Sequence, residues 1–247
     1  MSFNAMAESL EQSEKRRQEF VSNVSHELKT PMTTIGGFVD GIRDGTIPPE
    51  QEQKYLTIIS DEVKRLSRLV RTLLQTSRLQ DQVEKQPLHP FDIGEMAIST
   101  MLTFEKKIES KNLEVDVNVP ETPVMVIGNS DAITQVMYNL VDNAVKFSNH
   151  DGRIGMNVRV KGNKANITVS NTGETIPPEQ QKLIFDRFHK TDSSRSMDKE
   201  GVGLGLYIVK TIIEKHGEDI SVTSNDGLTE FTFTMTLAQK ETGNGKK

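Results

Sequence analysis

The chain has 247 residues, no cysteine and a formal net charge of −5, a length that allows one large or two small domains. The absence of cysteine excludes disulfides, thiol catalysis and zinc sites built on cysteine, and the mild acidity argues against a nucleic-acid binder. The longest stretch without a charged side chain, Thr30 to Val39, has ten residues, too few for a membrane span.

Apolar residues recur at alternating spacings of three and four along residues 3–42 and again along residues 56–77. This period is typical of long helices that pack side by side. In the first run, Ser13 and Arg17 interrupt the apolar seam. Residues 44–49 are rich in glycine and proline and mark a turn. The pattern therefore predicts an antiparallel helical hairpin.

A hairpin of two helices leaves half of its apolar seam uncovered. A second copy of the chain would close a four-helix bundle, so we expect a homodimer. The alternative is that the seam packs on the chain's own second domain.

Proline-rich residues 86–90 mark a linker, and mixed helices and strands follow it. We expect helices near 93–110, 131–147 and 203–216, and strands near 113–119, 124–127, 153–160, 165–170, 220–224 and 229–237. In the long polar segment 171–200, Phe185 and Phe188 are spaced to anchor one short helix. This order predicts an α+β fold with a helix layer on one mixed sheet, and a disordered tail over 243–247.

His26 is the informative residue of the hairpin. At 100° per residue it lies about 200° from Val24, and so faces away from the apolar seam. An isolated exposed histidine is usually a solvated side chain, but the neighbours of His26 carry chemistry. Glu27 can accept a proton from a nucleophilic imidazole, Thr30 can orient a water, and Pro31 can bend the helix.

Asn139, Asn143 and Lys146 are spaced to share one face of the helix over 131–147. Amide oxygens suit Mg²⁺, which takes few protein ligands and obtains the rest from phosphates and water. A lysine supplies a charge for phosphate. If this pattern stood alone, an ordinary polar helix face would be the better explanation.

Gly201, Gly203 and Gly205 open the helix over 203–216, where phosphates can approach exposed backbone donors. Their spacing matches neither the P-loop nor the dinucleotide-binding pattern. The polar segment before them has the length of a mobile lid. The two motifs together predict a phosphate-binding site.

Over residues 1–238 the chain resembles the cytoplasmic core of bacterial two-component sensor histidine kinases. Residues 25–31 resemble the phosphoacceptor box of that family and residues 139–147 its Mg²⁺-ATP box. Residues 185–188 resemble the aromatic box of its lid and 201–206 its second glycine box. Residues 3–7 resemble the last helix of the HAMP signalling module.

The resemblance implies that His26 is phosphorylated, that Glu27 is its base, and that Thr30 positions water when the partner is dephosphorylated. It places Lys190 near the γ-phosphate and Asn143 on Mg²⁺. The residues it assigns to the nucleotide are Asn139, Asn143, Lys146, Phe147, Asn171, Gly173, Gly201, Gly203, Gly205 and Leu206.

One motif departs from the family pattern, which reads Asp-x-Gly-x-Gly-Ile where this chain has residues 171–176. Asn171 keeps an oxygen that can accept a hydrogen bond from the adenine amino group, but it lacks the charge of aspartate. That charge is worth about 1 kcal/mol, or at most about tenfold in affinity. Thr175 replaces the second glycine and stiffens the start of the lid. We expect weakened or rearranged adenine recognition.

The resemblance also implies a division of the chain. Residues 1–19 would end a HAMP-type signalling helix, 20–85 form the dimerisation and phosphotransfer hairpin, 86–238 the ATP-binding domain, and 239–247 the tail. The expected activity is ATP-dependent autophosphorylation on His26, transfer to an aspartate of a response regulator receiver domain, and regulator dephosphorylation. The expected location is the cytoplasmic portion of a bacterial inner-membrane sensor, joined to the membrane only through an upstream region.

Three alternatives remain open at this point. The altered adenine box is compatible with a relative in which phosphatase activity dominates or kinase activity is weak. An ATP-driven clamp of the superfamily that includes gyrase and heat-shock chaperones shares the asparagine and glycine boxes, but it lacks a His-Glu pair on a helical hairpin. A structural bundle without nucleotide would leave Asn143, Lys146 and the glycines without a role.

Overall fold

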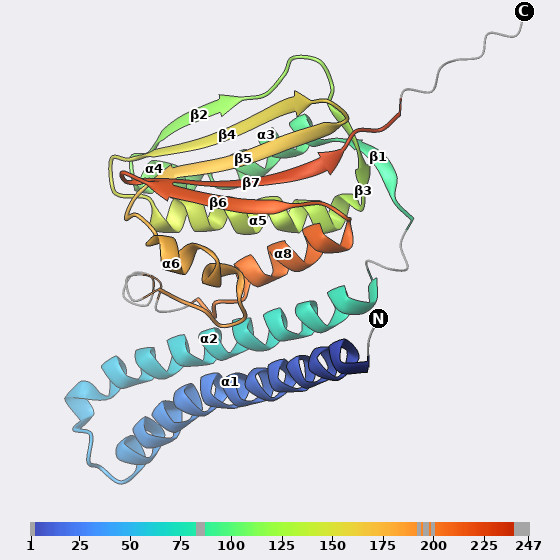
Figure 1. Ribbon diagram of the computed structural model, residues 1–247. Helices are drawn as coiled ribbons and strands as arrows, with labels where there is room; N and C mark the ends of the chain where they lie inside the picture. The colour runs from blue at the N-terminus through green and yellow to red at the C-terminus, as the bar shows by residue number, and fades with distance from the viewer. Residues whose placement is uncertain (1–2, 83–86, 192–193, 195–197, 199–200, 240–247) are drawn as a thin grey trace, which may run out of the picture. The chain divides into compact units, whose positions relative to one another are not determined.

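The computed structural model describes residues 3–82, 87–191, 194, 198 and 201–239 (Figure 1). The chain divides into two compact units, Met1–Gln75 and Thr76–Lys247. No helix in the part of the chain that the structure describes is long and apolar enough to cross a lipid bilayer.

The first unit is the helical hairpin predicted from the heptad spacing. Helices α1 (Phe3–Arg43) and α2 (Pro49–Gln82) run antiparallel (Figure 1). In the turn, the Asp44 carboxylate accepts a hydrogen bond from the Thr46 N–H at 2.9 Å. Ile47 packs so closely on Gly41 that a Cβ at Gly41 would lie 3.1 Å from the Ile47 Cδ1. These contacts fix the reversal of the chain.

The two helices of the hairpin contact each other through an aromatic pair. The rings of Phe38 and Tyr55, both half-buried, lie 4.9 Å apart between centroids. Other seam residues stay open to solvent, with exposures of 45% for Val39 and 47% for Val63. One chain therefore covers only part of its own seam.

The second unit is a two-layer α/β sandwich. Its five-stranded sheet has the order β2-β4-β5-β7-β6, with β2 parallel to β4 and the other pairs antiparallel. The strands are β2 (Glu114–Asn118), β4 (Arg153–Lys161), β5 (Lys164–Thr172), β6 (Ile220–Asn225) and β7 (Leu228–Thr236). Figure 1 shows one face of this sheet covered by helices α3 (Ile93–Thr103), α5 (Ser130–Phe147) and α8 (Gly205–Lys215). The predicted fold class is confirmed.

The core lies between the sheet and these helices because side chains alternate along each strand. On β5, Ile167 and Val169 are fully buried, as is Phe233 on β7. The opposite face of the sheet is polar, and there the hydroxyls of Thr168 and Thr232 lie 2.9 Å apart.

The residues expected to form a linker include a short strand. Strand β1 (His89–Asp92) pairs antiparallel with β3 (Met125–Gly128). Proline tolerates such an edge position because it needs no ladder donor there. The Asp92 carboxylate then caps α3 by accepting the Gly94 N–H at 2.9 Å.

The long helix expected over 93–110 is interrupted. Phe104 separates α3 from α4 (Glu105–Ser110), and it is 2% exposed with a ring 4.8 Å from that of Tyr138. Burial of this ring redirects the chain at a position that helical periodicity alone does not mark.

The short helix expected to carry both aromatic residues of the polar segment is wrong in detail. Helix α6 (Pro178–Gln181) and the 3₁₀ turn η1 (Leu183–Phe185) include Phe185 but end before Phe188. Phe188 has φ +61° and donates its N–H to the Gly203 carbonyl at 2.9 Å. The tail expected over 243–247 lies outside the described residues.

Candidate functional site

His26 lies on the solvent side of α1, as the helical wheel predicts. Its imidazole makes no hydrogen bond with any described residue. One turn along the helix, the Thr30 hydroxyl donates to the His26 carbonyl at 3.2 Å. Thr30 is also exposed, so both side chains are accessible to a partner.

The Glu27 carboxylate is directed across the hairpin. Its Oε2 accepts a hydrogen bond from Arg65 Nη2 on α2 at 3.3 Å. The other terminal nitrogen of Arg65 lies 3.8 Å from Glu62 Oε2. Sequence analysis did not select Arg65, because the helical period places it on α2 without showing which residue of α1 it faces.

Helix α5 begins at a conventional cap and carries the asparagine motif. The Asn129 side chain caps the helix by accepting the Ala132 N–H at 3.1 Å. Further along, Asn139 Nδ2 donates to the Gly205 carbonyl at 3.5 Å, which links α5 to the start of α8. Asn143 is half-buried, and its amide has no hydrogen-bond partner among the described residues. It is available to a ligand.

Lys146 stands between two carboxylates. Its Nζ lies 2.7 Å from Asp142 Oδ2 and 3.6 Å from Asp198 Oδ2, while Lys107 contacts the other oxygen of Asp142 at 2.9 Å. Burial acts to lower the pKa of Lys146, but Asp142 and Asp198 outweigh it and raise the pKa above its ordinary value. Burial likewise acts to raise the pKa of Asp142, and the two lysines hold that pKa below its ordinary value. Lys146 and Asp142 are therefore both ionised at neutral pH.

Asp198 contacts several of the groups that sequence analysis assigned to phosphates. Besides the contact with Lys146, its Oδ1 accepts the Gly201 N–H at 2.7 Å. Its carbonyl accepts a hydrogen bond from Lys190 Nζ at 2.8 Å. Sequence analysis missed Asp198, because the polar segment has no periodicity that would single out one of its acids.

Gly203 and Gly205, around the start of α8, have different surroundings. Gly203 has φ +72°, and a Cβ there would come within 2.9 Å of the Phe188 and His189 backbone. Gly205 is the first residue of α8, and a Cβ there would meet nothing within 4 Å. Leu206 follows it on the helix and is half-buried. Gly205 thus leaves open space at a helix N-terminus.

The end of β5 is held against the end of α5. Gly173 forms an isolated antiparallel bridge with Ser148, and a Cβ at Gly173 would lie 2.2 Å from the Phe147 carbonyl oxygen. Asn171 is 5% exposed, and its side-chain amide has no hydrogen-bond partner in the described part of the chain. The Thr175 hydroxyl accepts the Gly227 N–H at 2.8 Å, which anchors the loop that follows.

The second unit therefore gathers the predicted nucleotide residues from three elements. Helix α5 supplies Asn139, Asn143, Lys146 and Phe147. The end of β5 and the residue after it supply Asn171 and Gly173, and the segment before α8 together with the first turn of α8 supplies the remaining residues. His26, Glu27 and Thr30 belong to the first unit. No group of three or more histidine, aspartate or glutamate side chains within the described residues forms a metal site. The open amide of Asn143 beside Lys146 fits a Mg²⁺-nucleotide, because Mg²⁺ takes few protein ligands when phosphates complete its shell.

Two family models match successive parts of this chain. Residues 16–82 match the His Kinase A (phospho-acceptor) domain. Residues 128–239 match the histidine kinase-, DNA gyrase B- and HSP90-like ATPase. The chain thus combines a phosphoacceptor hairpin with an ATPase-type sandwich.

Curated relatives and solved structures agree on what this combination is. Sensor histidine kinase YclK of Bacillus subtilis is 33% identical over 97% of this chain, and sensor protein SrrB of Staphylococcus aureus is 32% identical over 92%. The chain belongs to the sensor histidine kinases of two-component systems. It spans 52% of the length of YclK and 39% of that of SrrB.

Solved structures show the same organisation. The histidine kinase ThkA, in complex with the response regulator protein TrrA, matches 93% of this chain and 66% of its own with a TM-score of 0.71 and 27% identity. The Acinetobacter baumannii histidine kinase AdeS matches 87% of this chain and 98% of its own, with a TM-score of 0.67 and 25% identity.

Proposed function

We propose that the chain is the core of an ATP-dependent protein histidine kinase that phosphorylates itself on His26. The observation that carries the proposal is the pairing of an exposed imidazole on a phosphoacceptor hairpin with an ATPase unit whose Asn143 amide is open. In the transfer, a ring nitrogen of His26 forms a bond to the γ-phosphorus as the bond from that phosphorus to ADP breaks. Glu27 accepts the proton that the imidazole releases.

Phosphoryl transfer depends mainly on positioning and on cations that stabilise charge on the transferring group. In the second unit, Lys146 and Lys190 would supply such charges, and Asn143 would hold Mg²⁺. Asn139 and the glycines would lie beside the phosphates. The side-chain oxygen of Asn171 would accept a hydrogen bond from the adenine amino group. Mg²⁺ would supply charge neutralisation between the phosphates.

The phosphoryl group would then pass from His26 to an aspartate of a response regulator. The complex of ThkA with TrrA supports this class of partner. The exposed Thr30 hydroxyl, one turn from His26, would orient a water when the same surface dephosphorylates the regulator. An ATP-driven clamp without phosphotransfer is disfavoured by the match to the phospho-acceptor domain.

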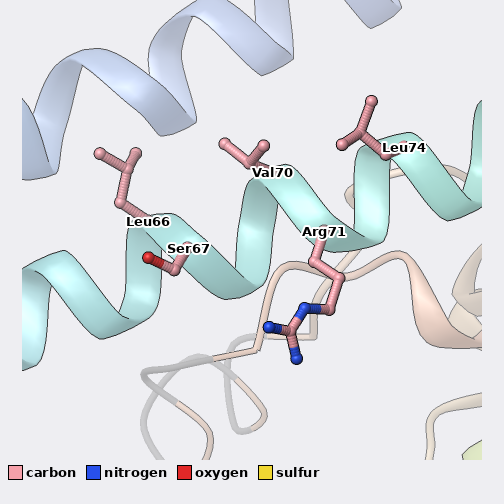
Figure 2. Close-up of a pocket in the computed structure, with 5 residues that line it drawn as sticks. All are labelled: Leu66, Ser67, Val70, Arg71 and Leu74. Atoms are coloured by element: carbon pink, nitrogen blue, oxygen red, sulfur yellow. The ribbon is translucent and has the colours of Figure 1, made fainter.

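We propose further that the hairpin forms a homodimer and that the natural protein is a membrane sensor with a HAMP module upstream of this core. The seam residues that one chain leaves exposed support the dimer. They are Val39, Leu56, Val63 and Val70, each more than 40% exposed. Figure 2 shows Leu66, Val70 and Leu74 directed to the same side of α2, where they line a mainly apolar hollow together with Ser67 and Arg71.

The nucleotide site is tested by calorimetric titration of Mg²⁺-ATP into the chain and two variants. Asn143→Ala should weaken binding by about tenfold or more, since it removes the open amide. Asn149→Ala is the matched control, because Asn149 is an exposed asparagine just beyond α5. Equal affinity for all three proteins would contradict the assignment of Asn143.

A further inference from the structure

Glu27, the proposed base, is hydrogen-bonded to Arg65 and not to His26. Glu27 is adjacent to His26 in sequence, yet its carboxylate is hydrogen-bonded to Arg65 at 3.3 Å. The two side chains are one-third and one-quarter exposed, at 33% and 25%, so water screens this ion pair only partly. A carboxylate oxygen that accepts a hydrogen bond from a guanidinium is held in position by it and is not free to turn to another donor.

Arg65 has a second carboxylate within reach. Its Nη1 lies 3.8 Å from Oε2 of Glu62, one turn earlier on α2. That oxygen is buried and has no hydrogen-bond partner among the residues that the structure describes, which is uncommon for a buried carboxylate. A small movement of the guanidinium toward Glu62 would satisfy this oxygen and release Glu27.

The turn that carries Glu27 also lacks one of the hydrogen bonds of a regular helix. In a helix the N–H of residue 31 would bond to the carbonyl of residue 27, but Pro31 has no N–H. The carbonyl of Glu27 therefore lacks its helical partner. Helix α1 continues through Pro31 without a break, so this turn can shift while the helix persists.

We propose that Arg65 is a positioning residue that withholds Glu27 from His26, and that Glu62 competes with Glu27 for Arg65. This inference rests on the proposed autophosphorylation of His26. With Arg65 on Glu27 the base is withdrawn. With Arg65 on Glu62 the Glu27 carboxylate is free to take the imidazole proton as the nitrogen–phosphorus bond forms and ADP departs.

The test is the rate of autophosphorylation of the chain with Mg²⁺-ATP, measured in three variants. Arg65→Gln should raise kcat several-fold and leave KM for ATP unchanged, because ATP binds in the other unit. Arg65→Lys keeps the charge and should restore a rate near that of the unmodified chain. Glu62→Gln removes the carboxylate that competes for Arg65 and should lower kcat, whereas Arg65→Gln should raise it.

Two controls connect the effect to Glu27. Lys64→Gln makes the same charge change beside Arg65, at a lysine that pairs with Asp61 at 3.0 Å, and should leave the rate unchanged. In a Glu27→Gln background, Arg65→Gln should lose its effect, since its target carboxylate is gone.

The inference is overturned if folded Arg65→Gln is slower than, or equal to, the unmodified chain. If that variant does not fold, Glu62→Gln decides, and a rate that is unchanged or higher rejects the competition. Absence of both ATP binding and label in the unmodified chain would instead reject the proposed function. That outcome is distinct, because it requires no variant.

Discussion

Asn171 is a buried polar residue whose amide has no described hydrogen-bond partner. It is 5% exposed and lies on β5 between Ile154 of β4 and Thr229 of β7. Burying an uncharged amide costs less free energy than burying an ionised carboxylate. With asparagine in place of aspartate, the unit is therefore more stable without nucleotide, but it lacks a charge-assisted hydrogen bond to a bound adenine.

Asn171→Asp should therefore have two opposite effects. Mg²⁺-ATP should bind more tightly, by at most about tenfold, since the charge adds about 1 kcal/mol to the hydrogen bond. The melting temperature without nucleotide should fall, because the new carboxylate is buried without a partner. Calorimetric titration and thermal melts measure the two effects. Unchanged affinity in a folded variant would show that Asn171 does not contact the base.

The sequence predicts the position of a residue where that position depends only on neighbours in the chain. The exposure of His26 follows from helical geometry, and the shared face of Asn139 and Asn143 follows from their spacing. Arg65 and Asp198 could not be predicted, because each is defined by a partner distant in sequence. No spacing rule connects Arg65 to Glu27 across the hairpin.

The segment before α8 is coupled to α5 through Asp198. Its carboxylate contacts Lys146 and accepts the Gly201 N–H, two groups proposed to meet phosphates. A triphosphate entering this site has to displace the carboxylate. Without nucleotide, the contact with Lys146 balances the charge of its ammonium.

Asp198→Asn should tighten Mg²⁺-ATP binding by about two- to fivefold, because the nucleotide no longer has to break the partly exposed Lys146–Asp198 ion pair, and such pairs contribute up to about 1 kcal/mol. Asparagine keeps an oxygen for the Gly201 N–H and so preserves the turn. Asp186→Asn is the control, because Asp186 is exposed on the same segment and makes the same charge change. Binding of adenosine, which has no phosphate, should be equal in all three proteins. Weaker ATP binding in Asp198→Asn would show that this acid supports the site.

The turn between α8 and β6 is fastened to the sheet by Glu218, whose side chain is 3% exposed and contacts Lys164 at 2.9 Å. Thr234 and Thr236 donate hydrogen bonds to it at 2.6 Å. Burial acts to raise the pKa of Glu218, but these three partners outweigh it and lower the pKa. The stabilisation is therefore present above the unfolded pKa and is lost as pH falls through the lower folded one.

Glu218→Gln should lower the free energy of unfolding by about 2 kcal/mol at pH 7. The loss should shrink toward acid, since the carboxyl of the unfolded chain takes up a proton below about pH 4 and that of the folded chain at still lower pH, where its lowered pKa lies. Urea unfolding at pH 7 and pH 3.5 measures both values. Glu121→Gln, at an exposed loop position, should show neither effect. An equal loss at both pH values would contradict the account of Glu218.

Most elements of the second unit could be predicted from alternation and periodicity, and their bounds agree within a few residues. Strand β1 could not be predicted, because its sequence begins with His-Pro and because the strand pairs only with β3 in the described structure. The break at Phe104 could not either, because the cause is a tertiary contact with Tyr138. In both cases the sheet or the core overrides the local preference.

The chain combines two units that each supply half of the proposed reaction. The hairpin presents His26, while the sandwich gathers the nucleotide residues. The exposed seam of the hairpin supports assembly with a second copy. A single hairpin leaves apolar side chains such as Val63 and Val70 in water, and burial of such surface drives association.

Val70→Glu should convert the proposed dimer to monomer. A buried unpaired charge costs several kcal/mol, so the dimer dissociation constant should rise by about 100-fold or more. Sedimentation velocity over a range of concentrations measures it. Val160→Glu is the control, because Val160 is 50% exposed on β4 of the other unit. A dimer unaffected by Val70→Glu would exclude this seam as the interface.

The most direct test of the central claim is to incubate the chain with Mg²⁺ and γ-labelled ATP and to score acid-labile, alkali-stable label on the protein. The account predicts label on the unmodified chain and on His150→Gln, a change at another exposed histidine. It predicts none on His26→Gln, which should remain folded because the imidazole faces solvent. Label that persists in His26→Gln, or its absence from an unmodified chain that binds ATP, would contradict the account.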